Sequence, residues 1–301
     1  MTNADLEKMV NTSDDWIQTR TGIKTRHIAA KDESTSDMAL QASLRAIDAA
    51  GINKDDIGLI VLATSTPDQI FPSTACFLQN HLEIRNHCPA FDIQAVCAGF
   101  VYAISVADNF MKSGKIKHAL IVGSENFSKI LDWNDRTTCV LFGDGAGAIV
   151  LEAADKPGVI NSVLHADGSY NQMLQVPYGV SKPEDDPFIR MQGKEVFKFA
   201  VQAMDKIVDE TLQSTGIKKE DINWLIPHQA NQRIINATAE KLQLPMSKVI
   251  MTVQDHGNTS AASIPLALDV GVRDGRIKQG EILLFEAIGG GFAWGANLLR
   301  Y

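Results

Sequence analysis

Cysteine is scarce in this chain, and long apolar runs and basic stretches are missing. The 301 residues contain four cysteines and no CxxC pair, so neither a disulfide framework nor a metal site is expected. Apolar runs such as 57–63 are far shorter than the roughly 20 residues that span a bilayer. The N-terminus shows no basic-then-apolar signal pattern. We therefore expect a cytoplasmic protein without membrane contact.

The acidic balance excludes another class of partner. Twenty-eight basic and 36 acidic residues leave a net charge of −8. An acidic chain without a basic run is a poor nucleic-acid binder, so we expect no nucleic-acid partner. A local basic patch for an acidic partner remains compatible with this balance.

Three pairs of similar segments indicate that the chain contains an internal repeat. GINKDDIGLIV at residue 51 resembles GIKKEDINWLI at residue 216, 165 positions later, and each follows a helical pattern (36–50 and 195–215). KSGKIKHALIV and RDGRIKQGEIL lie 161 positions apart, and GAGAIVL resembles AWGANLL. Coincidence among common α/β patterns is the alternative. We predict two α/β halves, residues 1–156 and 157–301, each with a mixed sheet flanked by helices.

The repeat leaves one strand without a counterpart. The second half opens with a strand pattern at 158–165, whereas the chain starts directly with a helical pattern at 3–10. Our hypothesis is that a first strand is missing from the first half.

Cys97 is the first candidate for chemistry. It follows the strand-like run 91–96 and precedes a helical pattern that begins at Gly99. A helix N-terminus favours the thiolate, so we expect a lowered pKa and a nucleophile. For a single cysteine considered alone, an inert buried side chain is the commoner role.

The second half offers partners for this thiol. The 161-residue offset places Cys97 opposite Asn258, and His228 follows a buried strand, where ligands bind in α/β sheets. Alone, His228 is as often a loop histidine, and Asn258 is more often an N-cap. Three glycines at 289–291 allow close approach to backbone N–H groups. FGDGAG at 142–147 is not a dinucleotide loop, because a strand is expected after it.

Eight segments, in this order, resemble β-ketoacyl-acyl carrier protein synthase III, the initiating condensing enzyme of type II fatty acid synthesis. They are DDWIQTRTGI, FPSTAC, VCAGF, FGDGAGA, HADGSY, PHQAN, HGNTSAAS and EAIGGGFAWG. The resemblance covers essentially the whole chain. It implies the thiolase fold, an α/β fold of two pseudo-twofold related βαβαβαββ halves in a five-layered α-β-α-β-α core. In that fold we expect the first strand to lie centrally in its sheet, so that losing it would be severely destabilising.

The resemblance also implies a mechanism. Cys97, His228 and Asn258 would form the triad, and the N–H groups of Cys97 and Gly290 the oxyanion hole. Cys97 would be acylated by an acyl-CoA primer, for which acetyl-CoA is our expectation. The acyl group would then be condensed with malonyl-acyl carrier protein as it decarboxylates. Acyl-CoA is a substrate, and no cofactor is needed. Elongating synthases use two histidines and degradative thiolases a second late cysteine, so both fit less well.

Binding residues follow from the same resemblance. Trp16 would stack on the adenine of CoA beside Arg20 and Arg136. Phe71 would reach the acyl pocket of the partner in a homodimer. Acyl carrier protein is acidic and needs a local basic patch. The candidates for that patch are Arg233 first, then Lys198 and Lys241, whereas Glu240 departs from an expected lysine pair.

Three other functions stay open at this point. One is a condensing enzyme of secondary metabolism with another acceptor. The second is a non-catalytic module that binds acyl-CoA or carrier protein, against which the complete triad argues. The third is a thiol redox sensor using Cys97. The length and branching of the primer are also open, because one methylene group is worth only ~1–3 kcal/mol of discrimination.

Overall fold

The computed structural model describes residues 1–156 and 158–301. Pro157, at the predicted boundary between the halves, lies outside the described residues. The strands are β1 (Ile57–Ala63), β2 (Ala90–Ile93), β3 (His118–Glu125), β4 (Gly145–Glu152), β5 (Val159–Ala166), β6 (Leu174–Gln175), β7 (Arg190–Met191), β8 (Trp224–Pro227), β9 (Ile282–Gly289) and β10 (Ala293–Arg300). The helices are α1 (Asn3–Leu6), α2 (Asp14–Thr21), α3 (Thr35–Ala50), α4 (Thr74–His81), α5 (Gly99–Met111), α6 (Gly193–Gln213), α7 (Gln232–Lys241), α8 (Val253–His256) and α9 (Ser263–Arg273).

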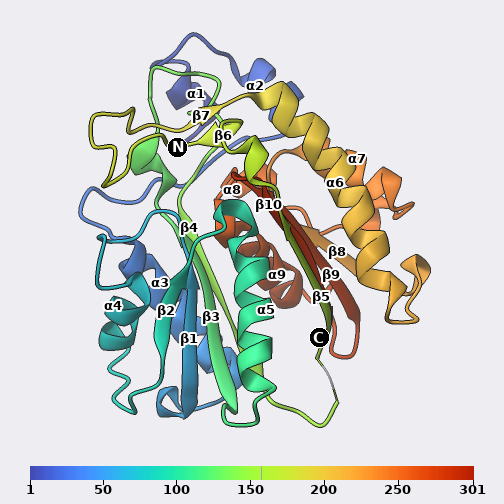
Figure 1. Ribbon diagram of the computed structural model, residues 1–301. Helices are drawn as coiled ribbons and strands as arrows, with labels where there is room; N and C mark the ends of the chain where they lie inside the picture. Colours follow the sequence, from blue (N-terminus) through green and yellow to red (C-terminus); the bar gives the residue numbers. More distant parts are fainter. Residues whose placement is uncertain (157) are drawn as a thin grey trace.

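Two sheets form the framework (Figure 1). In the described chain one runs in the order β2-β1-β3-β4 and the other in the order β5-β10-β9-β8. β1 pairs in parallel with β2 and β3, and β4 is antiparallel to β3. In the second sheet β8 and β9 are parallel, and β10 is antiparallel to β9 and β5. The mixed sheets predicted from the repeat are therefore confirmed.

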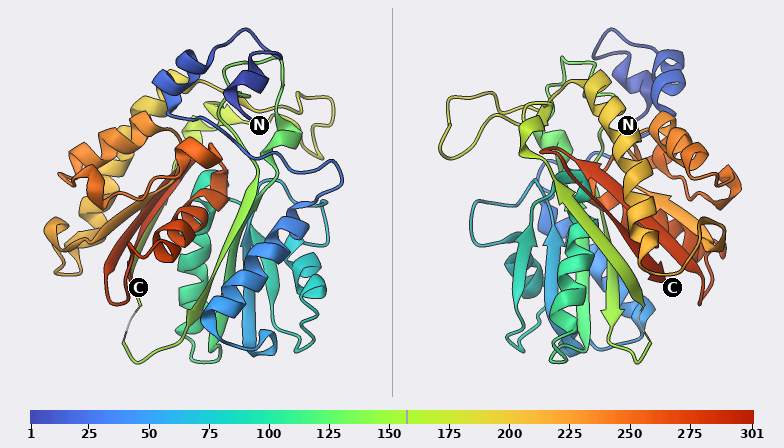
Figure 2. Two further views of the ribbon diagram at one scale, coloured as in Figure 1. Left: turned by 180° about the vertical axis from the view of Figure 1, so that it is seen from behind. Right: turned by 45° about the vertical axis from the view of Figure 1, so that its right-hand side comes forward.

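Helices cover both faces of each sheet (Figures 1 and 2). α5 and α9 lie between the sheets, where α5 contacts β1 and β3 on one side and β9 and β10 on the other. The apolar core between the sheets includes Val61 and Ile104 from the first half and Ile264 and Phe285 from the second. α3 and α4 cover the outer face of the first sheet, and α6 covers that of the second beside α7. None of the described helices combines the length and apolar character needed to cross a membrane.

Local sequence signals explain the helix boundaries. α3 begins after Ser34, whose side chain accepts from Asp37 N–H while the Asp37 carboxylate accepts from the backbone of Ser34. It ends at Gly51, which has φ +66°, a conformation that glycine adopts without a steric cost. The predicted helices at 36–50 and 195–215 are confirmed as α3 and α6, while the 3–10 pattern is helical only in α1.

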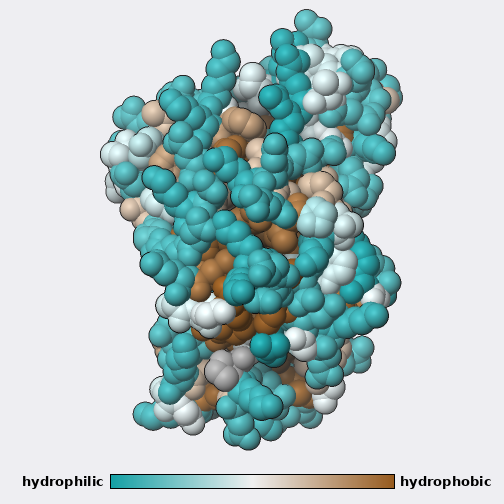
Figure 3. Space-filling model, turned by 90° about the vertical axis from the view of Figure 1, so that its right-hand side faces the viewer, coloured by the Kyte–Doolittle hydropathy of each residue, from teal (hydrophilic) through white to brown (hydrophobic). Residues whose placement is uncertain are grey.

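β5 corrects one expectation about the fold. It opens the second half at the edge of its sheet and, among the described strands, pairs with β10 alone, so the predicted central position of a first strand is wrong for this half. β4 resembles β10 in sequence, yet no described strand pairs with the edge of β4 that faces away from β3. Its apolar residues Ile149 to Leu151 are therefore only partly buried and line an apolar groove of about 450 Å³. On the face shown in Figure 3, apolar side chains (brown) reach the surface among hydrophilic ones.

The structural equivalence of the halves differs from the 161-residue offset. Val96, with φ +49°, opens the 3₁₀ turn before α5, and Ser260, with φ +50°, opens the 3₁₀ turn before α9 (260 − 96 = 164). β3 and β9 begin at the same separation (282 − 118 = 164). The counterpart of Cys97 is therefore Ala261, and the predicted match with Asn258 is wrong by three residues. The halves differ by small insertions that a single offset does not reveal.

Candidate active site

Cys97 lies in the 3₁₀ turn Val96–Ala98, directly before α5. It is 3% exposed. Burial raises the pKa of its thiol to about 12, and the negative charge of Glu125 adds to the rise, while the Ser260 hydroxyl opposes it. The predicted placement at a helix start is confirmed, but the predicted lowering of the pKa is wrong, because burial outweighs the helix N-terminus here.

His228 follows β8, and its ring is held from the start of α9. Its Nδ1 lies 2.7 Å from Ser263 Oγ, and the same oxygen accepts a hydrogen bond from Gln229 N–H. Among the described residues the Ser263 hydroxyl hydrogen has no acceptor other than Nδ1, so it donates there and the ring carries its proton on Nε2. Burial lowers the pKa of His228 to about 3, which keeps the ring neutral. His228 is thus a neutral Nε2–H donor.

Asn258 is fixed by its backbone and by one side-chain bond. Its N–H donates to Leu141 O, and its carbonyl accepts from Gly143 N–H, each at 2.9 Å. Its Oδ1 accepts from Ser260 N–H at 2.9 Å. Nδ2 has no hydrogen-bond partner among the described residues, so both of its N–H groups are available to a substrate oxygen.

The glycines after β9 bring its end against the nucleophile turn. A Cβ on Gly289 would lie 2.7 Å from Cys97 N and 2.6 Å from Ala95 O, so only glycine allows this approach. A Cβ on Gly290 would lie 2.6 Å from Leu174 O. Gly289 therefore brings the end of β9 against the Cys97 turn, and Gly290 packs against the backbone of Leu174.

An apolar cluster beside this place was not predicted from the sequence. Phe127, Leu131, Phe142 and Ile189 are its buried members, and Val96 and Leu174 pack against it. Phe142 also forms a backbone bridge with Asn258. These residues come from separate loops, so no periodic pattern identifies them. Ser263 was also missed, although a serine at a helix start is a usable signal.

Trp16, Arg20 and Arg136 come together on the surface, as the resemblance implied. The guanidinium carbons of Arg20 and Arg136 lie 4.6 Å and 5.2 Å from the centre of the Trp16 ring. Arg136 Nη1 also donates to Asn11 O at 2.8 Å. An aromatic face with two cations is suited to a phosphorylated heteroaromatic ligand.

The remaining candidates lie on outer elements. Arg233 on α7 stacks over Phe197 of α6, and Lys198 is exposed on α6. Lys241 pairs with Asp205 at 3.3 Å, which offsets its charge. Phe71 is 79% exposed in the loop after β1 and lies outside the apolar cluster of its own chain.

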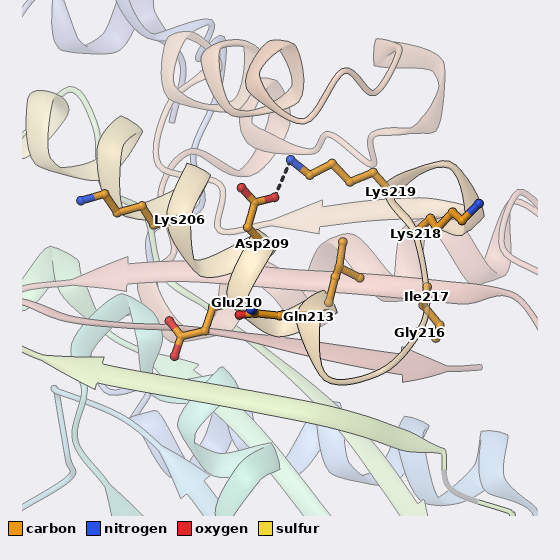
Figure 4. Close-up of a pocket in the computed structure, with 9 residues that line it drawn as sticks. Lys206, Asp209, Glu210, Gln213, Gly216, Ile217, Lys218 and Lys219 are labelled. Carbon is orange, nitrogen blue, oxygen red and sulfur yellow. Dashed lines mark ion pairs between the residues drawn. The ribbon is translucent and has the colours of Figure 1, made fainter.

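A broad surface concavity contains none of these residues. Its volume is about 720 Å³, and it is bounded by the end of α6 and the loop that follows, with an ion pair between Lys219 and Asp209 (Figure 4). The absence of Cys97, His228 and Asn258 from its lining argues against a catalytic role.

Comparisons with known proteins agree with this geometry. Residues 91–168 match the family model "3-Oxoacyl-[acyl-carrier-protein (ACP)] synthase III", and residues 212–301 match its C-terminal model. The chain is 59% identical to the β-ketoacyl-[acyl-carrier-protein] synthase III of Neisseria meningitidis over 303 residues, covering 100% of this chain and 95% of the relative. The chain belongs to the β-ketoacyl-[acyl-carrier-protein] synthase III family. It is therefore an acyltransferase that catalyses the initiating condensation of fatty acid synthesis.

Solved structures of related proteins show the same fold. The 3-oxoacyl-[acyl-carrier-protein] synthase III of Aquifex aeolicus VF5 superposes with a TM-score of 0.95 at 48% identity, covering 100% of this chain and 95% of that chain. The priming β-ketosynthase of the R1128 polyketide pathway superposes with the same TM-score at 35% identity, covering 100% and 91%. The thiolase-like α/β fold of this synthase family is thus confirmed.

Proposed function

We propose that Cys97, His228 and Asn258 carry out the condensation and that the primer is acetyl-CoA. The observation that carries the assignment is a pair of hydrogen-bond donors: a neutral His228 with its proton on Nε2, and an Asn258 amide whose N–H groups have no partner among the described residues. Both suit an enolate oxygen, which needs donors and no base.

The first step transfers the acyl group. The sulfur of Cys97 attacks the thioester carbon of acyl-CoA, the bond from that carbon to the CoA sulfur breaks, and the thiol proton of Cys97 ends on CoA. Negative charge on the thioester oxygen is stabilised by the N–H groups of Cys97 and Gly290, and Gly289, next to Gly290, approaches the Cys97 backbone closely.

The second step forms the carbon–carbon bond. Malonyl-acyl carrier protein loses carbon dioxide, and His228 Nε2–H and Asn258 Nδ2–H stabilise the enolate oxygen. The enolate carbon attacks the acyl group on Cys97, and the Cys97 sulfur leaves as a thiolate that takes up a proton from solvent. Removing one such donor commonly costs ~2.7–4 kcal/mol of barrier.

A short primer fits the apolar cluster. Phe127, Phe142 and Ile189 are almost fully buried, and Leu174 packs against them over Gly290. Room for more than a short acyl chain therefore requires these side chains to move, which costs packing energy. This favours acetyl over long or branched primers.

Substrate carriers and assembly are part of the same proposal. CoA would bind across Trp16, Arg20 and Arg136, and acyl carrier protein would dock at Arg233 and Lys198, with Lys241 contributing less. The exposed Ile70 and Phe71 would be covered in a homodimer, since apolar side chains 75% and 79% exposed are costly to leave in water. The two sheets with helices on and between them would form the five-layered core, with halves dividing at residues 156 and 157.

Mass spectrometry tests the assignment. The chain is incubated with acetyl-CoA beside Cys97→Ala, and peptides are mapped. We expect an acetyl group on Cys97 and none in the variant. With malonyl-acyl carrier protein added, wild type should form a 3-ketoacyl product, while His228→Ala and Asn258→Ala should retain acetylation and lose decarboxylation. Acetylation without condensation on any carrier protein would refute the condensing role.

A further inference from the structure

Glu125 is a buried carboxylate that the proposed mechanism does not use. It is the last residue of β3 and is fully buried. Its Oε2 accepts hydrogen bonds from the Thr66 hydroxyl at 2.8 Å, from Ser65 N–H at 3.0 Å and from the Thr64 hydroxyl at 3.3 Å. These three donors belong to the loop that follows β1, and none of them carries a charge.

The other oxygen of Glu125 reaches into the second half of the chain. Oε1 accepts a hydrogen bond from the Ser260 hydroxyl at 3.0 Å. Ser260 opens the turn before α9 with φ +50°, a conformation that costs a non-glycine residue energy and needs outside support. The bond to Glu125 supplies such support.

Ser260 in turn orients the amide of Asn258. Its backbone N–H donates to Asn258 Oδ1 at 2.9 Å, which decides that Nδ2 faces the substrate side. Turning the amide over would place an N–H group against the Ser260 N–H and leave both donors without an acceptor. The direction of the catalytic donor therefore depends on where the backbone of Ser260 lies.

The buried location of Glu125 is electrostatically unfavourable for both Glu125 and Cys97. Burial raises the pKa of Glu125 to about 7, although the hydrogen bonds from Ser65, Thr66, Ser260 and Thr64 oppose the rise. Its charge also raises the pKa of Cys97. A group that hinders the nucleophile electrostatically is better explained by what it holds in place than by any action on Cys97.

We propose that Glu125 is a positioning residue that holds Ser260 and, through it, directs the Asn258 Nδ2 donor at the malonyl oxygen. The link crosses from the first half of the chain to the second, so it also sets the two halves of the site in register. This inference rests on the proposed roles of Cys97 and Asn258.

The test separates the two half-reactions. Ser260→Ala breaks the link and leaves the other three bonds of Glu125 intact. We expect decarboxylation of malonyl-acyl carrier protein to slow about tenfold, since a misdirected donor loses part of its effect. Acetyl transfer from acetyl-CoA to Cys97 should slow less than decarboxylation does, because Asn258 acts only in the second step and losing the Ser260 hydroxyl affects the first step only through the pKa of Cys97. Retained acetylation also shows that the variant is folded.

Two further variants make the test specific. In Glu125→Gln the amide oxygen can replace Oε2, and the amide N–H can donate to Ser260 Oγ, so decarboxylation should stay within about twofold of wild type. Glu184→Gln, which removes one carboxylate at an exposed position, is the control and should also leave decarboxylation unchanged. In an Asn258→Ala background, Ser260→Ala should cause no further loss.

The outcomes distinguish the inference from the proposed function. If Ser260→Ala slows both half-reactions equally, the positioning role is wrong. It is also wrong if adding Ser260→Ala to Asn258→Ala slows decarboxylation further than Asn258→Ala alone. If wild type acetylates Cys97 and decarboxylates malonyl-acyl carrier protein but Ser260→Ala matches it, only the inference fails. If wild type does not acetylate Cys97, the proposed function itself fails.

Discussion

Glu286 makes the stability of this protein depend on pH in a predictable way. The residue lies on β9 and points toward α6 and α7, where it lines a small cavity with Met204 and Thr238. Its Oε2 has no hydrogen-bond partner among the described residues. Burial raises the pKa of this carboxyl from 4.5 to about 8.

Proton linkage gives the direction in which the free energy of unfolding changes with pH. The folded state holds the proton more tightly than the unfolded state, so the stabilising effect is complete below about pH 4.5 and is lost as the pH rises through about 8. For a rise from 4.5 to about 8, linkage lowers the free energy of unfolding by on the order of 3 kcal/mol between pH 5 and pH 8. Glutamine has nearly the same shape and does not titrate. The free energy of unfolding of Glu286→Gln, relative to that of wild type, should therefore increase by that amount between pH 5 and pH 8.

Urea unfolding of both proteins at pH 5, 6, 7 and 8 measures this difference. Other groups that titrate contribute to both proteins and cancel in the comparison. Glu184→Gln, at an exposed position, controls for the loss of one carboxylate. A gap between Glu286→Gln and wild type that stays constant from pH 5 to pH 8 would show that the buried carboxyl does not titrate as argued.

Three further predictions concern catalysis. Ser263→Ala should slow malonyl decarboxylation by up to about tenfold and leave the KM for acetyl-CoA unchanged, because the lost hydrogen bond to His228 Nδ1 is worth ~0.5–1.5 kcal/mol. An equally large loss in the rate of Cys97 acetylation would contradict the assigned tautomer of His228. Leu174→Ala should increase labelling of Cys97 by hexanoyl-CoA relative to acetyl-CoA, measured by mass spectrometry, because it opens the apolar cluster; an unchanged ratio would place the limit elsewhere. Trp16→Ala should raise the KM for acetyl-CoA about tenfold with kcat nearly unchanged, as expected for lost ground-state binding worth ~1–2 kcal/mol; a fall in kcat alone would refute a CoA-binding role.

Local signals predicted most of the fold. The apolar run at 57–63 and the helical pattern at 36–50, with Gly51 after it, became β1 and α3 because strand burial and helix capping are decided within a few residues. The repeat correctly predicted two mixed sheets. The position of β5 at the sheet edge was not predictable in this way, since strand order depends on pairing between distant segments.

The sequence by itself determined the chemistry that is present: one thiol before a helix, one histidine after a buried strand, and one asparagine in HGNTSAAS. Only the tertiary structure decided their electrostatic states. Burial by surrounding elements raises the pKa of Cys97 and lowers that of His228, and Ser263 sets the tautomer of the ring. Such effects fall off over a few ångströms, so they depend on neighbours that are close in space but distant in the chain. The link from Glu125 to Ser260, which spans 135 residues, has the same origin.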